Sequence, residues 1–168
     1  SGATSGITFN DGTKQTTAYI VGSIEAYDLS SSISLTSTPT LLTPASQINA
    51  NNITYNSSTG VFTWQYSGGF SLSLVVNAIA SASNQFVYIY AENNTGSGWT
   101  LNVNSGKIYQ LVNSQQTQIV YSQDVHRVAG QQVRYRIYSN DSKVSLQTTV
   151  LPSTSTVYVP AIRIQYAG

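Results

Sequence analysis

The amino-acid sequence lacks cysteine and methionine altogether and has few charged residues. Without cysteine, the chain cannot form a disulfide framework, a thiolate zinc site or a thiol nucleophile. Charged residues make up 8% of the chain, against about 25% in average globular domains. None lies between Asp28 and Glu92, so hydroxyl and amide side chains must keep this stretch soluble. Such a surface suits a protein held rigidly in an assembly, and a polar secreted β domain is the alternative.

The small amount of charge also limits the partners to be expected. The formal net charge is +1, which provides no electrostatic attraction for nucleic acid or an anionic membrane. No apolar run approaches the length of about 18 residues that a membrane-spanning helix needs. No two acids have the spacing of a calcium loop. We therefore expect no nucleic-acid partner, no membrane insertion, no metal and no cofactor.

Candidate catalytic groups are few, because His126 is the only histidine. It lies near Asp124 and Arg127 at the expected end of a strand, and a Ser-His-Asp triad would need a nucleophile and an oxyanion hole from elsewhere. The chain has no nucleophile-elbow sequence. A glycosidase pair among the six acids is the last-ranked alternative, an enzyme acting on host surface polysaccharide. We expect a non-enzymatic protein with no catalytic residues, in which His126 is structural or contacts another subunit.

Alternation of apolar and polar residues is the main structural signal. In residues 70–80 every even-numbered residue is apolar, whereas Ser71, Ser73 and Asn77 are among the odd-numbered ones. This is the pattern of a strand buried on one face. Further strands are expected at residues 61–66, 85–92, 99–103, 116–125, 131–139, 143–150 and 157–166. These short strands, with turns between them and no helical pattern, predict an all-β antiparallel β-sandwich, and specifically a jelly roll.

The first 30 residues have a different pattern. The triplet Asn10-Asp11-Gly12 separates residues 7–9 from 13–15, and Asp-Gly favours a tight hairpin turn because glycine accepts a positive φ. A hairpin this short is not stable alone, so it must pair with another chain or dock on a partner. The expected organisation is an N-terminal anchor or trimerisation segment in residues 1–30 and a jelly-roll domain in residues 31–168.

The stretch from Gly6 to Tyr19 reads GITFNDGTKQTTAY and resembles a short element of bacteriophage fibre and appendage proteins. In that element an apolar-x-aromatic pair precedes a DGT turn and the letters QTTA. The resemblance implies a junction where a fibre or decoration subunit trimerises or attaches. The residues that it places at this anchor or trimer interface are Ile7, Phe9, Asp11, Gly12, Thr13, Gln15 and Tyr19.

The remainder of the chain is similar to the C1q/TNF-like jelly roll that such phage proteins carry at the C-terminus. The similarity rests on the patterns at residues 60–64, 70–74, 128–133 and 162–166. It implies a homotrimer with the first and last strands near the threefold axis. Tyr135 and Tyr166 share their parity with aliphatic residues, so both are expected in the interior or at this axis. They are therefore counted among the candidate interface residues.

Tyrosine is abundant, with 12 residues, and exposed aromatic rings suit both subunit interfaces and sugar-binding surfaces. Tyr88 and Tyr90 alternate with Val87 and Ile89, so one of the two sets must face away from the core. With Trp99 they are candidates for a subunit interface, for ordinary packing or for contact with a glycan.

Together these features predict a non-enzymatic structural protein on the surface of a phage virion. It would be a trimeric head decoration, head fibre or tail fibre, anchored by its N-terminal segment to virion proteins of the capsid, neck or fibre. The alternative is a receptor-binding fibre tip that recognises host surface glycan through turn-rich segments such as 93–98 and 140–143.

Overall fold

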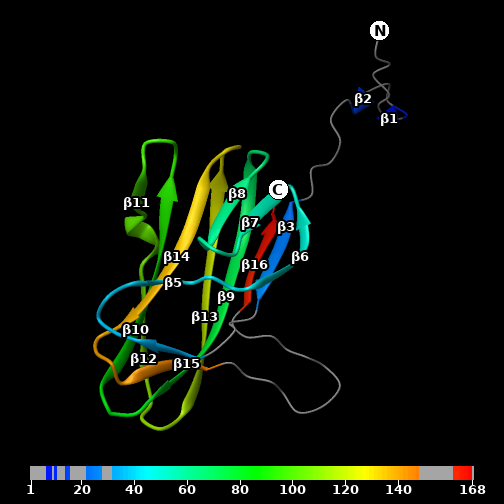
Figure 1. Ribbon diagram of the computed structural model, residues 1–168. Coiled ribbons are helices and arrows are strands. Elements are labelled where there is room, and N and C mark those ends of the chain that lie inside the picture. The colour runs from blue at the N-terminus through cyan, green and yellow to red at the C-terminus, as the bar shows by residue number, and fades with distance from the viewer. Residues whose placement is uncertain are drawn as a thin grey trace.

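The fold is a sandwich of two antiparallel β-sheets (Figure 1). A computed structural model of the chain describes residues 7–8, 10, 14–15, 22–27, 32–147 and 161–167. Within these ranges the only helix is the 3-10 turn η1 (Val103–Ser105). The all-β antiparallel prediction is confirmed. The described part of the chain contains no helix with the length and apolar character needed to span a bilayer.

One sheet, here called sheet I, is built around β10 and β14. Strands β11 and β12 pair with β10 one after the other along its outer edge, and β5 and β8 pair in the same way with β14. Strand β7 completes the sheet beside β8. The strands are β5 (Thr40–Leu41), β7 (Ile53–Asn56), β8 (Val61–Trp64), β10 (Gln85–Asn94), β11 (Trp99–Leu101), β12 (Lys107–Leu111) and β14 (Gln132–Ser139).

The other sheet, sheet II, is built around the long strand β9. Strand β13 runs along one side of β9, and β15 and β16 follow one another along the other side. Strand β4 pairs with β15, and β3 and β6 continue the sheet beyond β16. The strands are β3 (Ser23–Tyr27), β4 (Ile33–Leu35), β6 (Ser46–Asn51), β9 (Gly68–Ala80), β13 (Gln116–Arg127), β15 (Val144–Gln147) and β16 (Ala161–Tyr166).

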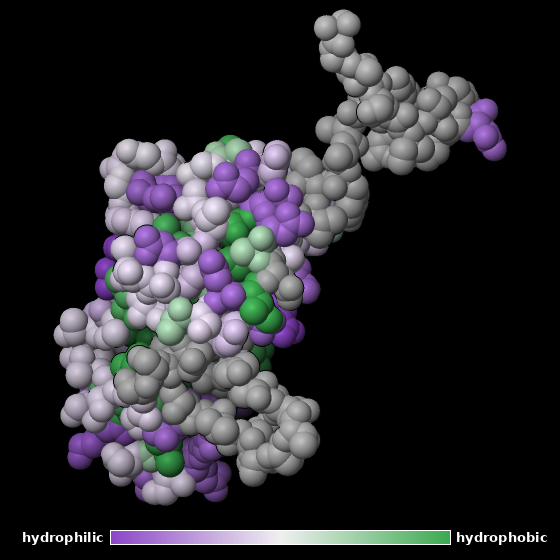
Figure 2. Space-filling view, turned by 45° about the vertical axis from the view of Figure 1, so that its right-hand side comes forward, coloured by the Kyte–Doolittle hydropathy of each residue, from purple (hydrophilic) through white to green (hydrophobic). Residues whose placement is uncertain are grey.

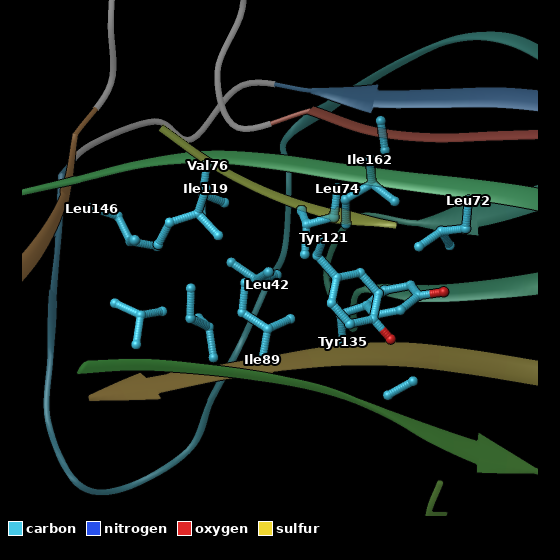
Figure 3. Close-up of a cluster of buried hydrophobic side chains, with 14 of the residues drawn as sticks. Leu42, Leu72, Leu74, Val76, Ile89, Ile119, Tyr121, Tyr135, Leu146 and Ile162 are labelled. Carbon is cyan, nitrogen blue, oxygen red and sulfur yellow. The ribbon is translucent and has the colours of Figure 1, made fainter. Parts of the chain in front are cut away.

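The hydrophobic core lies between the two sheets and follows the predicted alternation. The even-numbered residues of β9 from Phe70 to Ala80 are at most 3% exposed, because successive side chains of a strand point to opposite faces. Figure 3 shows Leu74, Val76 and Ile119 of sheet II facing Ile89 across the sandwich. The two sheets therefore bury one face each and leave the other face outside, as the one-sided patterns predict.

Strand β3 is part of the sandwich, although it lies in the expected N-terminal segment. Its residues Ser23–Tyr27 lie within the segment 1–30, yet β3 is paired on one side with β16 and on the other with β6. The jelly-roll sheet thus includes residues on the N-terminal side of the expected domain boundary. The expected N-terminal hairpin is present as β1 (Ile7–Thr8) paired antiparallel with β2 (Lys14–Gln15).

Several strands differ from the sequence expectations. Strand β9 begins two residues earlier than predicted and β13 ends two residues later, because the two pair along their whole length to Gly68 and Arg127. The strands that the sequence pattern did not predict are β3, β4, β5, β6, β7 and β12. These are two to six residues long. Whether such short segments form strands depends on the strands that they pair with in the folded chain.

Candidate binding surfaces

The outward face of sheet I carries a ladder of polar and aromatic pairs. The register of β10 and β14 sets four pairs of residues directly opposite one another, and they are Tyr88–Tyr138, Tyr90–Arg136, Glu92–Arg134 and Asn94–Gln132. Their neighbours along β10, Val87, Ile89 and Ala91, are buried in the core. Because strand residues alternate between faces, the four pairs face outward, and this face is here called the ladder.

An ion-pair network lies at the centre of the ladder. Glu92 accepts from Nε of Arg134 at 2.6 Å and pairs with Nε of Arg136 at 2.8 Å. Burial by itself would raise the pKa of the Glu92 carboxyl, but the bonds and charges of Arg136 and Arg134 outweigh it and hold the pKa below its ordinary value. One carboxylate between two guanidinium groups leaves this part of the face with a net positive charge.

Tyr88, Tyr90 and Trp99, the three candidates for a ligand or interface contact, all lie on this face. Tyr88 stacks on Tyr138 with ring centroids 4.6 Å apart, and Tyr90 meets Tyr138 edge to face at 6.2 Å. The guanidinium carbon of Arg134 lies 4.1 Å from the ring centre of Trp99, a cation–π geometry. The three candidate residues are half-buried, so each is packed on one side and reachable on the other.

A groove crosses sheet I beside Trp99. Its volume is about 380 Å³, and its lining is Thr54, Tyr55, Asn56, Thr59, Val61, Thr63, Trp99, Gln132 and Arg134. These residues come from β7, β8, β11, β14 and the turn between β7 and β8. Sequence reasoning found Trp99 but missed the rest, because no local pattern shows that β8 lies beside β14.

Exposed apolar side chains gather around one edge of the sandwich on the outer faces of both sheets, because Leu101 and Ile108 lie opposite the ladder residues Glu92 and Tyr88, whereas Val120 points outward from sheet II. Five large hydrophobic side chains there are 51% to 78% exposed, namely Leu101, Val103, Ile108, Val112 and Val120, and they are here called the apolar edge. They lie on or next to β11, β12 and β13. Tyr109 links the edge strands of the two sheets by donating its hydroxyl to the carbonyl of Val120 at 3.0 Å.

The apolar edge contrasts with the rest of the surface. The other large hydrophobic side chains exposed in the described ranges, Ile48, Tyr66 and Val128, are single residues elsewhere in the chain. On the side drawn in Figure 2, the described surface is mainly hydrophilic or intermediate in hydropathy, and hydrophobic residues form small patches. Exposed apolar side chains that gather in one region are typical of interaction sites.

The outward face of sheet II is polar and nearly neutral. Arg163 pairs with Glu25 at 3.0 Å, and the Ser71 hydroxyl donates to Asp124 at 2.6 Å. His126 is exposed near the end of β13, and no hydrogen bond joins it to Asp124 within the described residues. The same ranges contain no group of three His, Asp or Glu side chains that could hold a metal ion.

Arg127 forms a buried polar cluster at one end of the sandwich. It is 3% exposed, lies 5.3 Å from the ring centre of Trp64 and donates to Asn93 Oδ1 at 3.2 Å. Burial lowers the pKa of Arg127 and raises that of Tyr121 to about 12. Sequence reasoning missed this cluster, although Arg127 shares its parity with Ile119 and Tyr121 on β13.

The two remaining tyrosine candidates, Tyr135 and Tyr166, differ in their burial. Tyr135 is fully buried and packs edge to face on Phe62 and Tyr121, so it lies in the interior and offers no surface to a second subunit. Tyr166 is half-buried against Phe70, with ring centroids 5.5 Å apart.

The structure describes two of the seven expected anchor residues. Ile7 and Gln15 are directly opposite one another in the β1–β2 pair. The other expected anchor residues, Phe9, Asp11, Gly12, Thr13 and Tyr19, lie outside the described residues.

Comparisons with known proteins identify the architecture. No protein-family model and no curated protein matches the sequence. The structure of Eiger TNF from S. frugiperda superposes with a TM-score of 0.62 at 10% identity, covering 89% of this chain and 92% of that one. Murine APRIL superposes with a TM-score of 0.56 at 9% identity, covering 88% of this chain and 99% of that one, in crystals at pH 8.0 and at pH 5.0. At such low identity the likeness establishes the fold alone, and the chain has the TNF-like jelly-roll fold.

Proposed function

We propose that the protein is a non-enzymatic structural component of a phage virion, a homotrimer displayed on the particle surface and anchored by its N-terminal segment. The observation that carries the trimer is the apolar edge. Five large hydrophobic side chains are exposed on it in a chain with only 8% charged residues. Burying this edge against a second copy removes apolar surface from water, which favours association.

The outward face of sheet II around β3 and β16, away from the edge strand β13, is the surface that we propose receives the apolar edge. Glu25 is already paired with Arg163 there. Desolvating this pair costs less than burying either charge alone. An edge that packs on a different face of the next copy is a heterologous contact, and such a contact closes into a ring of three when it rotates each copy by about 120° around one axis.

The virion assignment rests on the N-terminal segment. The string from Gly6 to Tyr19 resembles the anchor element of phage fibre and appendage proteins, and it precedes a domain with the jelly-roll fold that the resemblance leads one to expect. A small hairpin such as β1–β2 is stabilised when it pairs with or docks on a larger partner. The proposed trimer would thus be attached by its N-terminal segments and would project its jelly rolls.

Native mass spectrometry and light scattering test the oligomeric state. The expected species contains three copies of the 18.1 kDa chain. The double variant Ile108→Ser/Val120→Ser should dissociate to folded monomers, because it places two hydroxyl groups in the apolar contact. Val128→Ser is the matched control, since Val128 is 58% exposed but lies outside the apolar edge. A wild-type protein that is monomeric at micromolar concentration would overturn the trimer.

Attachment to the particle is tested separately. Antibodies raised against residues 31–168 should label intact virions of the encoding phage in immuno-electron microscopy. Deleting residues 1–19 should abolish incorporation into particles while the far-ultraviolet circular dichroism of the jelly roll is kept. Virions without label, or full incorporation of the truncated chain, would contradict the proposed location and anchor.

A further inference from the structure

We propose that the groove beside Trp99 on sheet I is a binding site for a saccharide that carries a carboxylate group. This inference goes beyond the trimeric scaffold of the proposed function, because it assigns a ligand to a groove whose lining includes no residue of the apolar edge. The groove volume of about 380 Å³ lies within the range of small-ligand sites. It suits a ligand of one or two sugar rings.

Three polar lining residues of the groove, Gln132, Thr63 and Thr54, follow one another across neighbouring strands in direct register. Asn94 continues this row next to the groove, between Gln132 and Trp99. The Asn94 amide donates to Gln132 Oε1 at 3.2 Å, and the Gln132 amide donates to the Thr63 hydroxyl at 3.4 Å. Side chains held in this way lose little conformational entropy when a ligand binds, which favours recognition by a shallow site.

Hydrogen-bonding groups remain available at the rim. Asn56 Oδ1 accepts from the backbone N–H groups of Ser58 and Thr59 at 3.0 and 3.2 Å, so its amide nitrogen is left to donate to a ligand. The exposed hydroxyls of Thr54 and Thr59 can both donate and accept. Sugar hydroxyls have the same dual character, and this lining matches them.

Trp99 supplies the apolar wall of the groove. Its indole is half-buried and is held by the guanidinium of Arg134, 4.1 Å from the ring centre. A large aromatic ring offers apolar area at little entropic cost, and the C–H face of a pyranose ring provides the complementary surface. A site with one aromatic wall and a few placed polar groups is typical of small-molecule recognition.

The positive charge of Arg134 in the groove favours a ligand with a negative charge. Arg134 is the single charged residue of the lining, and no Asp or Glu is among the lining residues. Its Nε is bound to Glu92 at 2.6 Å, whereas its two terminal nitrogens have no hydrogen-bond partner in the ranges that the structure describes. A guanidinium with free terminal nitrogens binds a carboxylate through two parallel bonds.

The position of the groove argues against an extended peptide as the ligand. Peptides that add a strand need a free strand edge, but the groove opens on the face of sheet I, and its central strands β8 and β14 are both paired on two sides, with β7 at the border of the sheet. The hydroxyl- and amide-rich lining also lacks the apolar pockets that hold peptide side chains. A small acidic sugar fits both the shape and the chemistry.

Saturation-transfer NMR on the full chain tests the proposal with matched probes. Sialyllactose, digalacturonic acid and a hyaluronan tetrasaccharide are the acidic probes, and lactose is the neutral counterpart of sialyllactose. We expect at least one acidic probe to bind with a dissociation constant on the order of 1 mM, with no detectable binding of lactose or sodium acetate. Equal binding of lactose, or no binding of any acidic probe, would overturn the proposal.

Single substitutions in the groove test whether the acidic probe binds there. Arg134→Gln and Trp99→Ala should each weaken the acidic probe about tenfold or more. Arg163→Gln is the matched control, because Arg163 is also paired with a glutamate but lies on sheet II, and it should bind as the wild type does. Unchanged affinity in folded Arg134→Gln or Trp99→Ala would refute the site, and Thr54→Val provides a milder variant if either fails to fold.

Tryptophan fluorescence gives a second readout. The chain has two tryptophans, of which Trp64 is fully buried, so a change in emission on adding the acidic probe should come from Trp99 and be absent in Trp99→Ala. A change that persists in this variant would place the ligand elsewhere. The oligomeric state plays no part in either readout, so the trimer and the sugar site fail independently.

Discussion

At the scale of single residues, two tyrosine hydroxyl groups inside the sandwich differ in their hydrogen bonding. The hydroxyl of Tyr121 donates to Gln123 Oε1 at 3.1 Å. The hydroxyl of Tyr135 is buried and has no partner among the described protein groups. Burial raises the pKa of both phenols, because an ionised ring would lose its hydration. Two neighbouring tyrosines in one core thus differ in what their hydroxyl groups contribute to stability.

Replacing each of these tyrosines by phenylalanine should separate the two cases. Tyr135→Phe removes an unpaired buried hydroxyl, so the free energy of unfolding should stay constant or rise by up to about 1 kcal/mol. Tyr121→Phe removes a hydrogen bond and should lower it by about 1 kcal/mol. Urea unfolding of both variants gives the comparison. A Tyr135→Phe variant less stable than Tyr121→Phe would contradict this assignment.

The ladder should make stability depend on pH through Glu92. Its pKa lies below the ordinary value of 4.5 in the folded protein, so the stabilising contribution is present above that value and is lost as pH falls through the lowered pKa. Glu92→Gln should lower the free energy of unfolding by about 1 kcal/mol at pH 7, since solvent screens this partly exposed pair. At pH 3 the difference should be smaller. A difference that stays constant from pH 7 to pH 3 would rule out this linkage.

At the scale of strands and turns, the long strands were predictable and the short ones were not. Strands β9, β10 and β14 alternate over enough residues for the pattern to exceed chance. Strands such as β4 and β5 have three and two residues, too few to show a period. Their sheet positions come from pairing with β15 and β14, which no local pattern contains.

The turn between β7 and β8 depends on a glycine. Gly60 has φ of +66°, and a Cβ there would lie 2.5 Å from the backbone oxygen of Leu42. Gly60→Ala should therefore lower the free energy of unfolding by about 2 kcal/mol or more. Gly106→Ala is the control, because Gly106 has φ of −66° and no atom within 4 Å of the added methyl. Thermal unfolding of both variants measures this, and equal midpoints would contradict the steric argument.

At the scale of the whole molecule, β3 and β16 bring the two ends of the jelly roll together. They pair with each other inside sheet II, and β16 also pairs with β9. Residues far apart in the chain must therefore meet before this sheet is complete, which makes folding slow. The C1q/TNF-like resemblance predicted that the first and last strands lie near a threefold axis, and this position stays a prediction.

Trimer formation should couple stability to protein concentration. Association stabilises the folded chain by mass action, so the thermal midpoint of the wild type should rise when the protein concentration is raised a hundredfold. The midpoint of Ile108→Ser/Val120→Ser should be independent of concentration, and Val128→Ser should behave as the wild type does. Differential scanning calorimetry over this range measures the effect. A wild-type midpoint that does not move would speak against the trimer.

The sequence by itself determined the fold class and the inward face of each long strand, because alternation is a local property of neighbouring residues. It also placed Tyr88, Tyr90 and Trp99 among the surface candidates. Only the tertiary structure decided which strands are neighbours. Gln132 bonds Thr63 across 69 positions of the chain, and this contact builds the groove beside Trp99. Local periodicity carries no information about such long-range pairing, so the groove, the apolar edge and the burial of Arg127 emerged only from the folded chain.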